Sequence, residues 1–430
     1  MRPSPAVRLL SVSALVWMTM LGLPPAQAVP PPQVDDRWLP KPARPAPPRP
    51  TVQREVCATM TTGSAPSRLT DLLDLPRVWQ LTRGTGQRVA VIDTGVSRHR
   101  LLADVVPGGD YVSGGDGTQD CDAHGTLVAG IIAATADSGS AGIAPEATVI
   151  SIRQSSGKFS PASDRSRGGV GDVDTMAKAV RTAADLGASV INISSVACVP
   201  VAAALDDRAL GAALAYAVDV KNAVVVAAAG NTGGAAQCPP QRSDATWETA
   251  TVAVSPAWYD DFVLTVGSVN PEGAPSGFTL AGPWVDIAAL GEAVTPLGSK
   301  PVSGTSYAAP VVSGLAALIR ARFPVLTARQ VMQRIESTAH HPSSGWDPLV
   351  GNGAIDALAA VSTDTGPPGP TSTPAPAPIA ASPPPAPQSA HARNTALRGV
   401  ALCLAALGVA LAAGVARRRL RHPRERVTGD

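Results

Sequence analysis

Short, almost wholly apolar runs alternate with longer amphipathic segments through the middle of the chain. Runs that are apolar at nearly every position predict strands buried on both faces of a parallel sheet. Five runs have this character: 88–93, 148–153, 189–194, 223–230 and 262–269. Segments with apolar and small residues at helical spacing lie between or after them: 125–136, 174–187, 207–220 and 306–323. This order predicts a three-layer α/β fold with a mainly parallel sheet, and its ligand site should lie at the carboxyl ends of the strands.

Two terminal segments depart from this pattern and predict export and membrane attachment. Residues 1–28 combine Arg2 and Arg8 with an apolar run and the ending "AQA", as a cleaved signal peptide does; an uncleaved anchor is the alternative. Residues 396–416 hold the run "GVALCLAALGVALAAGVA", whose 18 positions span about 27 Å as a helix, enough for a bilayer core. The basic tail that follows, 417–430, predicts a single-pass protein of the plasma membrane with a cytoplasmic C-terminus and an extracytoplasmic main body.

Proline content divides the remaining chain. Residues 29–75 form a proline-rich N-terminal extension, and residues 364–395 form a second proline-rich linker. Such stretches are typical of semi-rigid spacers, which leaves residues 76–363 as one folded domain. The two ends of the chain carry a net charge of +6 against +2 for the whole chain, so the body between them is acidic, with a net charge of −4. An acidic body argues against nucleic acid as the main partner.

The cysteines agree with an exported body. Cys57, Cys121, Cys198 and Cys238 lie where disulfides can persist, and four cysteines allow three connectivities. Cys403 lies in the apolar run and is expected to be unpaired. No Cys/His spacing resembles a zinc site, and we expect neither a metal nor a cofactor. The acidic stretch "GGDGTQDCDAHG" is an alternative calcium site, but it lacks the spacing of an EF-hand.

Three short motifs carry candidate chemistry. Asp93 ends the strand 88–93, where a buried carboxylate costs free energy unless it has partners. His124, in "DAHGTLVAG", precedes a helix whose N-terminus should help to keep the imidazole neutral, as a general base requires. Ser306, in "SGTSYAAP", begins the helix 306–323, whose backbone N–H groups would stabilise an oxyanion. Taken singly, each has an ordinary alternative as a turn or helix-capping residue.

The joint pattern is more specific than its parts. Asp, His and Ser follow in the order found in subtilisin, and the motifs "DTGV", "HGTLVAG" and "GTSYAAP" closely resemble those of the subtilisin-like (S8) serine proteases. The resemblance implies a subtilisin-like fold, an endopeptidase that acts on proteins or peptides, and a catalytic triad of Asp93, His124 and Ser306. It also implies that Asn231, in "AAAGN", contributes to the oxyanion hole.

The whole chain resembles the mycosins, the membrane-anchored subtilases of actinobacterial type VII secretion systems. The shared features are the proline-rich extension, the single C-terminal membrane helix and Cys198 shortly after "INIS". The resemblance implies the disulfides Cys57–Cys121 and Cys198–Cys238, and association with the type VII secretion membrane complex. It implies an enzyme that processes exported proteins; the alternative is a mainly structural component of the complex, with proteolysis secondary.

Three departures from the secreted subtilisins qualify this resemblance. The extension is too short and too proline-rich for the folded pro-domain that those enzymes carry. The stretch "NISSVACVP" stands where many of them have a glycine-rich strand of the substrate pocket, so specificity stays open. Residues 154–174 read as an inserted polar loop, either for partner docking and substrate gating or simply solvated. A carbohydrate hydrolase would need paired carboxylates, and no sequence feature singles out such a pair.

Overall fold

The structure is a computed structural model, which describes residues 31–61, 63, 68–135, 139–164, 168–203, 205–234 and 237–362. The predicted signal peptide (1–28), second linker (364–395), transmembrane helix (396–416) and basic tail (417–430) lie outside the described residues. Within the described ranges, no helix combines the length and apolar character needed to span a bilayer.

A seven-stranded sheet forms the centre of the domain, with the strand order β11-β10-β8-β6-β2-β4-β3. All of its strand pairings are parallel, as predicted. The five predicted strands are present as β2 (Arg88–Asp93), β4 (Thr148–Arg153), β6 (Val190–Ile193), β8 (Val224–Ala228) and β10 (Leu264–Val269). Every residue of β6, β8 and β10 is buried, which explains why apolar residues occupy both faces of these strands.

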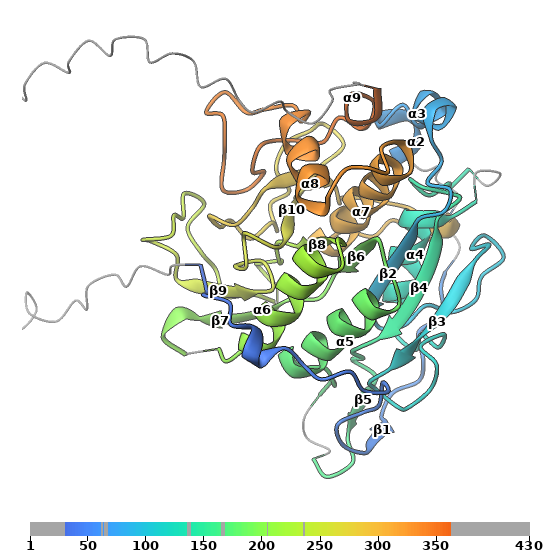
Figure 1. Cartoon of the computed structure of the whole chain (residues 1–430), viewed down its shortest axis with the longest axis vertical. Helices are drawn as coiled ribbons and strands as arrows, with labels where there is room; N and C mark the ends of the chain where they lie inside the picture. Colours follow the sequence, from blue (N-terminus) through green and yellow to red (C-terminus); the bar gives the residue numbers. More distant parts are fainter. Residues whose placement is uncertain are drawn as a thin grey trace, which may run out of the picture. The chain divides into compact units, whose positions relative to one another are not determined.

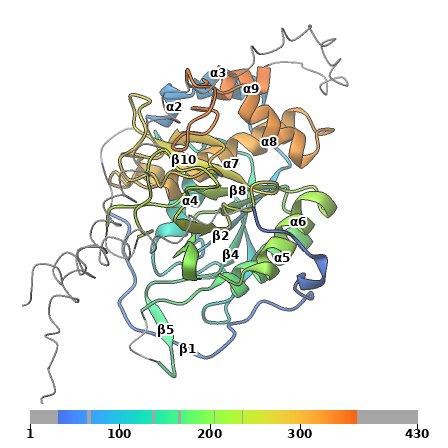
Figure 2. The same cartoon turned by 90° about the vertical axis from the view of Figure 1, so that its left-hand side faces the viewer.

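Helices cover both faces of this sheet, so the predicted three-layer α/β architecture is confirmed. Figure 2 shows α5 (Val173–Asp185) and α6 (Arg208–Ala215) on one side of the sheet, and α4 (His124–Ala133) and α7 (Thr305–Arg322) on the other. A π-helical segment, η3 (Tyr216–Val220), continues α6 to the end of the predicted helix. Small residues in α4 and α7 permit close packing; for example, a Cβ at Gly314 of α7 would lie 2.5 Å from Ile143.

Several elements were not predicted. The edge strands are β3 (Val105–Asp110) and β11 (Ile287–Leu290), and β7 (Ala197–Pro200) pairs antiparallel with β9 (Val252–Ser255). The additional helices are α2 (Leu69–Leu72), α3 (Leu75–Leu81), α8 (Ala328–Ser337) and α9 (Ala357–Ser362). The side chains of Leu69 and Leu75 lie in the core, so the packed domain begins ahead of residue 76.

The proline-rich extension, for which the sequence predicts a semi-rigid spacer, packs on the domain. It runs along α6 and α5 in dark blue in Figure 1, beginning with η1 (Asp36–Trp38). The Arg208 guanidinium lies 3.9 Å from the centre of the Trp38 ring, and Arg181 Nη1 donates a hydrogen bond of 3.2 Å to the Pro40 carbonyl. An extended proline-rich backbone makes no internal hydrogen bonds, so its carbonyls are available to side chains of the domain.

The extension also pairs with the predicted inserted loop. Strand β1 (Thr51–Gln53) of the extension lies antiparallel to β5 (Phe159–Pro161), and Ser156 forms a backbone bridge with Val170. Gln154 at the start of the loop is buried. The described part of the predicted loop is therefore held by backbone pairing and by the extension, and it is not simply a solvated loop.

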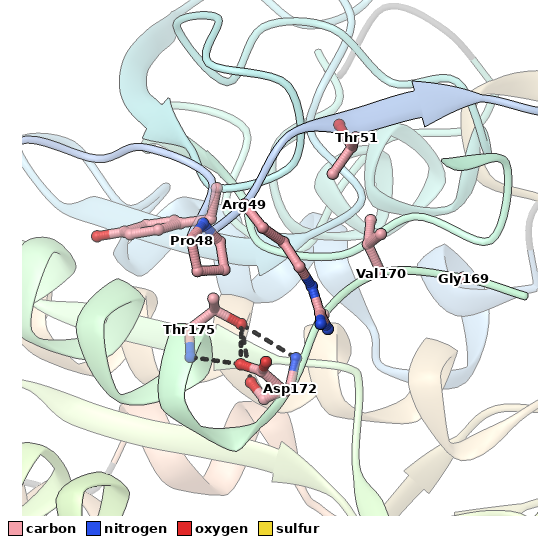
Figure 3. A pocket seen from close by; sticks show the side chains of 9 residues that line it. Pro48, Arg49, Thr51, Gly169, Val170, Asp172 and Thr175 are labelled. Carbon is pink, nitrogen blue, oxygen red and sulfur yellow. Dashed lines mark hydrogen bonds between the residues drawn. The ribbon is translucent and has the colours of Figure 1, made fainter. Parts of the chain in front are cut away.

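A crevice lies between the extension and the start of α5 (Figure 3). Pro48 and Arg49 line one side, and Val170 and Asp172 line the other. The Arg49 side chain extends toward the N-terminus of α5, where the Asp172 carboxylate caps the helix by accepting a hydrogen bond of 2.8 Å from Thr175 N–H. This crevice shares no lining residue with the predicted triad.

Candidate active site

Asp93 and His124 are in contact at the carboxyl end of β2. Asp93 Oδ1 lies 2.7 Å from His124 Nδ1 and accepts a second hydrogen bond of 2.7 Å from Thr94 N–H. The Asp93 side chain is fully buried, whereas 27% of the His124 side chain is exposed. The carboxylate therefore fixes one ring nitrogen from the interior, and the imidazole keeps an accessible edge.

A glycine allows this close approach of helix and strand. His124 is the first residue of α4, and Gly125 follows it. A Cβ at Gly125 would collide with the Gly95 carbonyl and would lie 3.1 Å from the Asp93 Cβ. A larger residue at 125 would push α4 away from β2 and lengthen the contact between Asp93 and His124.

The electrostatic balance at His124 differs from the sequence-based expectation. Burial lowers the pKa of His124, but the neighbouring carboxylates of Asp93, Asp120 and Asp122 outweigh it, so the pKa is raised above its usual value. The expectation that the helix N-terminus keeps the imidazole neutral overlooked these carboxylates. The imidazolium form is thus stabilised at this position.

Ser306 is the second residue of α7, and the residue after it contacts the imidazole. The ring of the following residue, Tyr307, packs against the His124 ring with a centroid distance of 5.3 Å. Burial, together with the charges of Asp93 and Asp120, raises the pKa of Tyr307 to about 12. Tyr307 therefore stays neutral beside the imidazole at physiological pH.

A proline in α7 leaves the Ser306 carbonyl free for another partner. Helix α7 begins at Thr305, so Pro310 lies in its second turn. Because proline has no N–H, it cannot donate to the Ser306 carbonyl four residues earlier. Ser194 Oγ donates to that carbonyl instead, at 2.9 Å.

Ser194 belongs to a buried polar chain that the sequence interpretation missed. Asn192 Nδ2 donates to Ser194 Oγ at 2.9 Å, and Ser313 Oγ of α7 donates to Asn192 Oδ1 at 2.9 Å. These bonds join β6 and the residue that follows it to α7, at Ser306 and again about two turns further on at Ser313. A signal was available, since Asn192 is a polar residue inside an otherwise apolar strand and must find partners there.

Asn231 lies beside the same helix start, and its amide orientation is fixed. Its Oδ1 accepts hydrogen bonds from Thr305 N–H at 2.9 Å and from Thr305 Oγ1 at 3.0 Å. Because two donors face the oxygen, the amide nitrogen must point the other way. A Cβ at Gly304 would lie 3.5 Å from this Nδ2, which places the amide nitrogen near the entry to α7. The structure thus brings all four predicted site residues to one end of the sheet.

The stretch "NISSVACVP" forms a wall of an adjacent cavity of about 190 Å³. Val196 and Ala197 line one side of it, and Met176 and Leu210 contribute apolar surface from α5 and α6. Gln154, at the start of the predicted inserted loop, is another of its lining residues. This stretch therefore lines a cavity next to Ser194, whose hydroxyl bonds to the Ser306 carbonyl.

The acidic loop before His124 uses its carboxylates internally. Asp116 accepts hydrogen bonds from Thr118, and Asp122 accepts hydrogen bonds from residues 156 and 157. Asp120 accepts hydrogen bonds from Thr94, the residue after β2, and from Thr126 in the first turn of α4. In the part of the chain that the structure describes, no group of three or more His, Cys, Asp or Glu residues is placed to hold a metal ion.

Both disulfides implied by the family resemblance are present. Cys57 is joined to Cys121, which ties the extension to the loop three residues before His124. The Ala58 N–H adds a backbone hydrogen bond of 2.8 Å to the Cys121 carbonyl. Cys198 is joined to Cys238, which ties β7 to the segment after Asn231.

Fold and site together define a subtilisin-like serine protease, and the model of the subtilase family matches residues 84–353. The chain is 66% identical over 457 residues to Mycosin-4 of Mycobacterium tuberculosis, with 100% of both chains covered. It is 43% identical to Mycosin-1 of the same organism, over 84% of this chain and 88% of the relative. The chain therefore belongs to the mycosins, within the subtilase family, and the resemblance seen in the sequence is confirmed.

Solved structures agree with this assignment. The MycP3 protease from the type VII (ESX-3) secretion system matches with a TM-score of 0.73 and 43% identity, covering 78% of this chain and 100% of that chain. A chain in the structure of an intact ESX-5 inner membrane complex matches with a TM-score of 0.73 and 38% identity, covering 90% of this chain and 100% of that chain.

Proposed function

We propose that this protein is a membrane-anchored serine endopeptidase that uses Asp93, His124 and Ser306 as its catalytic triad. The observation that carries the proposal is the 2.7 Å contact between Asp93 and His124, with the start of α7 packed against the same imidazole through Tyr307. A buried carboxylate, a partly exposed imidazole and a serine at a helix N-terminus supply the base, its orienting acid and a nucleophile.

The proposed reaction is acyl transfer from a peptide. Ser306 Oγ attacks the peptide carbonyl while His124 accepts its proton, and Asp93 holds the imidazole and stabilises the imidazolium. His124 then gives this proton to the leaving amine, and an acyl-enzyme remains on Ser306. Water then attacks the ester while His124 accepts its proton, and His124 passes this proton to Ser306 Oγ as the ester bond breaks, which releases the acid and restores Ser306.

The negative charge that develops on the peptide oxygen needs donors, and two are proposed. The N–H groups of the first helical turn have no partner within the helix, so the Ser306 N–H at the start of α7 is available. The Asn231 amide nitrogen is the second donor, because its oxygen is already bound to Thr305. Donors fixed before reaction stabilise the transition state without reorganisation.

We further propose that the enzyme works at the outer face of the plasma membrane. The basis is the sequence: a signal peptide (1–28), a linker (364–395), a transmembrane helix (396–416) and a basic cytoplasmic tail (417–430) around the peptidase domain. A relative was solved within an ESX-5 inner membrane complex, and another structural match is a periplasmic assembly from that complex. By this analogy the protein associates with a type VII secretion complex and processes proteins exported by it.

The second candidate function is a mainly structural role in the secretion complex, with proteolysis secondary. The presence of relatives in assembled complexes favours it, whereas the well-formed contact between Asp93 and His124 favours retained catalysis. The two roles make different demands, because a scaffold needs the surface of the domain but not the Ser306 hydroxyl.

The test compares Ser306→Ala with Ser303→Ala, which removes a neighbouring hydroxyl from the same motif. Purified full-length protein is profiled on a peptide library. In a second experiment, each variant replaces the wild type in cells that secrete proteins through the type VII secretion system. The proposal predicts that only Ser306→Ala abolishes cleavage. Normal secretion with Ser306→Ala would assign the secretion role to the scaffold, and equal peptide cleavage by both variants would contradict the proposed triad.

A further inference from the structure

We propose that Asp120 is a positioning residue for the triad: its carboxylate joins the end of β2 to the first turn of α4 and so holds Asp93 and His124 in contact. The inference rests on the proposed function, because it concerns the same two catalytic groups. It was not made from the sequence, where Asp120 was only one acidic residue in the stretch before His124.

One oxygen of Asp120 binds the strand side. Thr94, the residue after Asp93, donates its hydroxyl to Asp120 Oδ1 at 2.8 Å. The same Thr94 hydroxyl oxygen accepts a hydrogen bond of 2.9 Å from Gly125 N–H, the residue after His124. A single hydroxyl therefore connects the neighbours of both catalytic groups, and Asp120 determines where that hydroxyl points.

The other oxygen binds the helix side. Asp120 Oδ2 accepts hydrogen bonds from Thr126 N–H at 2.9 Å and from Thr126 Oγ1 at 2.7 Å. The N–H groups of a first helical turn need partners outside the helix. Ala123, at the capping position of α4, makes no side-chain cap hydrogen bond. Asp120 and Thr94 supply the missing acceptors, so they set the position of the turn that begins with His124.

A further pair of bonds fixes Asp120 itself. Asp120 N–H donates to Ser97 Oγ at 3.2 Å, and Ser97 N–H donates to Thr126 Oγ1 at 3.0 Å. These bonds close a ring that runs from the segment after β2, through the loop, to α4. Asp122 N–H also donates to Asp120 Oδ1 at 3.1 Å, so both carboxylate oxygens have two donors each.

The charges around this ring make Asp120 more than a neutral acceptor. The ionisable groups that face it are Asp93, Asp122, His124 and Tyr307. Burial, opposed by the hydrogen bonds from Thr126 and Thr94, raises the pKa of Asp120. The Asp120 charge in turn contributes to the raised pKa of His124. Loss of this charge should therefore shift the pH profile, and loss of the bonds should lower the rate.

The central experiment uses Asp120→Asn in the full-length protein. An amide of the same shape has one acceptor oxygen and an NH₂ group that cannot accept from Thr126 or Thr94. Displacement of reacting groups by about 1 Å costs about 10²-fold in rate, so we expect plateau kcat to fall by about that factor while KM is unchanged. The acid limb of the pH profile should move to lower pH, because the imidazolium loses a stabilising charge.

Asp122→Asn is the matched control. It removes a negative charge from the same loop, and that charge also contributes to the raised pKa of His124. The Asp122 carboxylate, however, bonds to Ser156 and Gly157 and makes no bond to β2 or α4. The control should move the acid limb in the same direction and keep the plateau kcat. If kcat fell equally in both variants, the fall would be caused by the loss of a negative charge from the loop, and the positioning role would be refuted.

Thr94→Val provides a second route if Asp120→Asn does not fold. It removes the shared hydroxyl, and we expect a similar loss of kcat. Where both variants fold, kcat of the double variant should fall no further than kcat of the more affected single variant. The reason is that both substitutions break the same set of hydrogen bonds. Unchanged kcat in Asp120→Asn, or simple additivity with Thr94→Val, would overturn the inference.

A readout without substrate separates this inference from the proposed function. The Nδ1 proton of His124, held against Asp93, should give a low-field NMR resonance in the wild type that is weakened or shifted in Asp120→Asn and retained in Asp122→Asn. If the wild type and Ser306→Ala cleaved peptides equally, the proposed function would fail while this signal still tested Asp120. An identical resonance in the wild type and Asp120→Asn would refute the positioning role alone.

Discussion

The contact between Asp93 and His124 allows a quantitative prediction for Asp93→Asn. The carboxylate is fully buried and lies 2.7 Å from the imidazole, so in the proposed mechanism it pairs directly with the imidazolium that would form when Ser306 loses its proton. With charge centres about 4 Å apart and an effective dielectric constant of about 20, this pairing is worth about 4 kcal/mol, or about 10³ in rate. Loss of control over the ring tautomer adds to this, and we expect kcat to fall by about 10⁴-fold in total.

The pH dependence of this variant has a defined sign. The pKa of His124 is raised because nearby carboxylates, Asp93 first among them, outweigh the effect of burial. Only the neutral imidazole acts as a base, so the rate of the wild type should rise with pH through this raised pKa and then reach a plateau. Asp93→Asn removes the carboxylate that contributes most to this rise in pKa. Its acid limb should therefore appear at lower pH than in the wild type.

The assay measures kcat and kcat/KM between pH 5 and pH 9 on a peptide found in the library screen. Thermal unfolding of the same preparations would separate a loss of chemistry from a loss of fold. Retention of kcat within about tenfold of the wild type, or an acid limb that moved to higher pH, would refute the role given to Asp93.

Three further predictions follow from the site. Gly125→Ala should destabilise the protein by about 1–3 kcal/mol and lower its activity, because the added Cβ would collide with the Gly95 carbonyl. As a control, Gly277→Ala should leave the free energy of unfolding and the activity unchanged, because its Cβ would meet nothing within 4 Å. Asn231→Asp keeps the oxygen that Thr305 binds but replaces the proposed oxyanion donor, so kcat should fall by at least about 10²-fold, with little change in melting temperature in calorimetry. Removal of the Cys57–Cys121 disulfide by a double Ser variant should cost about 4 kcal/mol in denaturant unfolding, because that bond closes a loop with a sequence separation of 64 residues.

The central strands and the covering helices could be predicted because burial on both faces leaves a direct mark on the sequence. The runs 88–93 and 148–153 coincide with β2 and β4, residue for residue. The edge strand β3 was missed because it reads "VVPGGD", and a proline is tolerated there only because the strand lies at the edge of the sheet.

The positions of the site residues could be inferred from motifs, but their electrostatics could not. The charge balance at His124 depends on Asp120 and Asp122, whose charges the fold brings close enough to raise its pKa, and spacing alone does not show this. The partners of Asn192 and Ser194 come from α7, more than a hundred residues further along the chain. The packing of the extension was missed because proline content indicates an extended backbone and says nothing about the surface that the backbone meets.

Mass spectrometric mapping of a fluorophosphonate adduct tests the central claim most directly. The full-length wild type is predicted to carry the label on Ser306 alone, and labelling should be lost with Ser306→Ala, strongly slowed with His124→Ala and unaffected by Ser303→Ala. A wild-type protein that stayed unlabelled while folded, or that was labelled on another serine with Ser306 unmodified, would contradict the account.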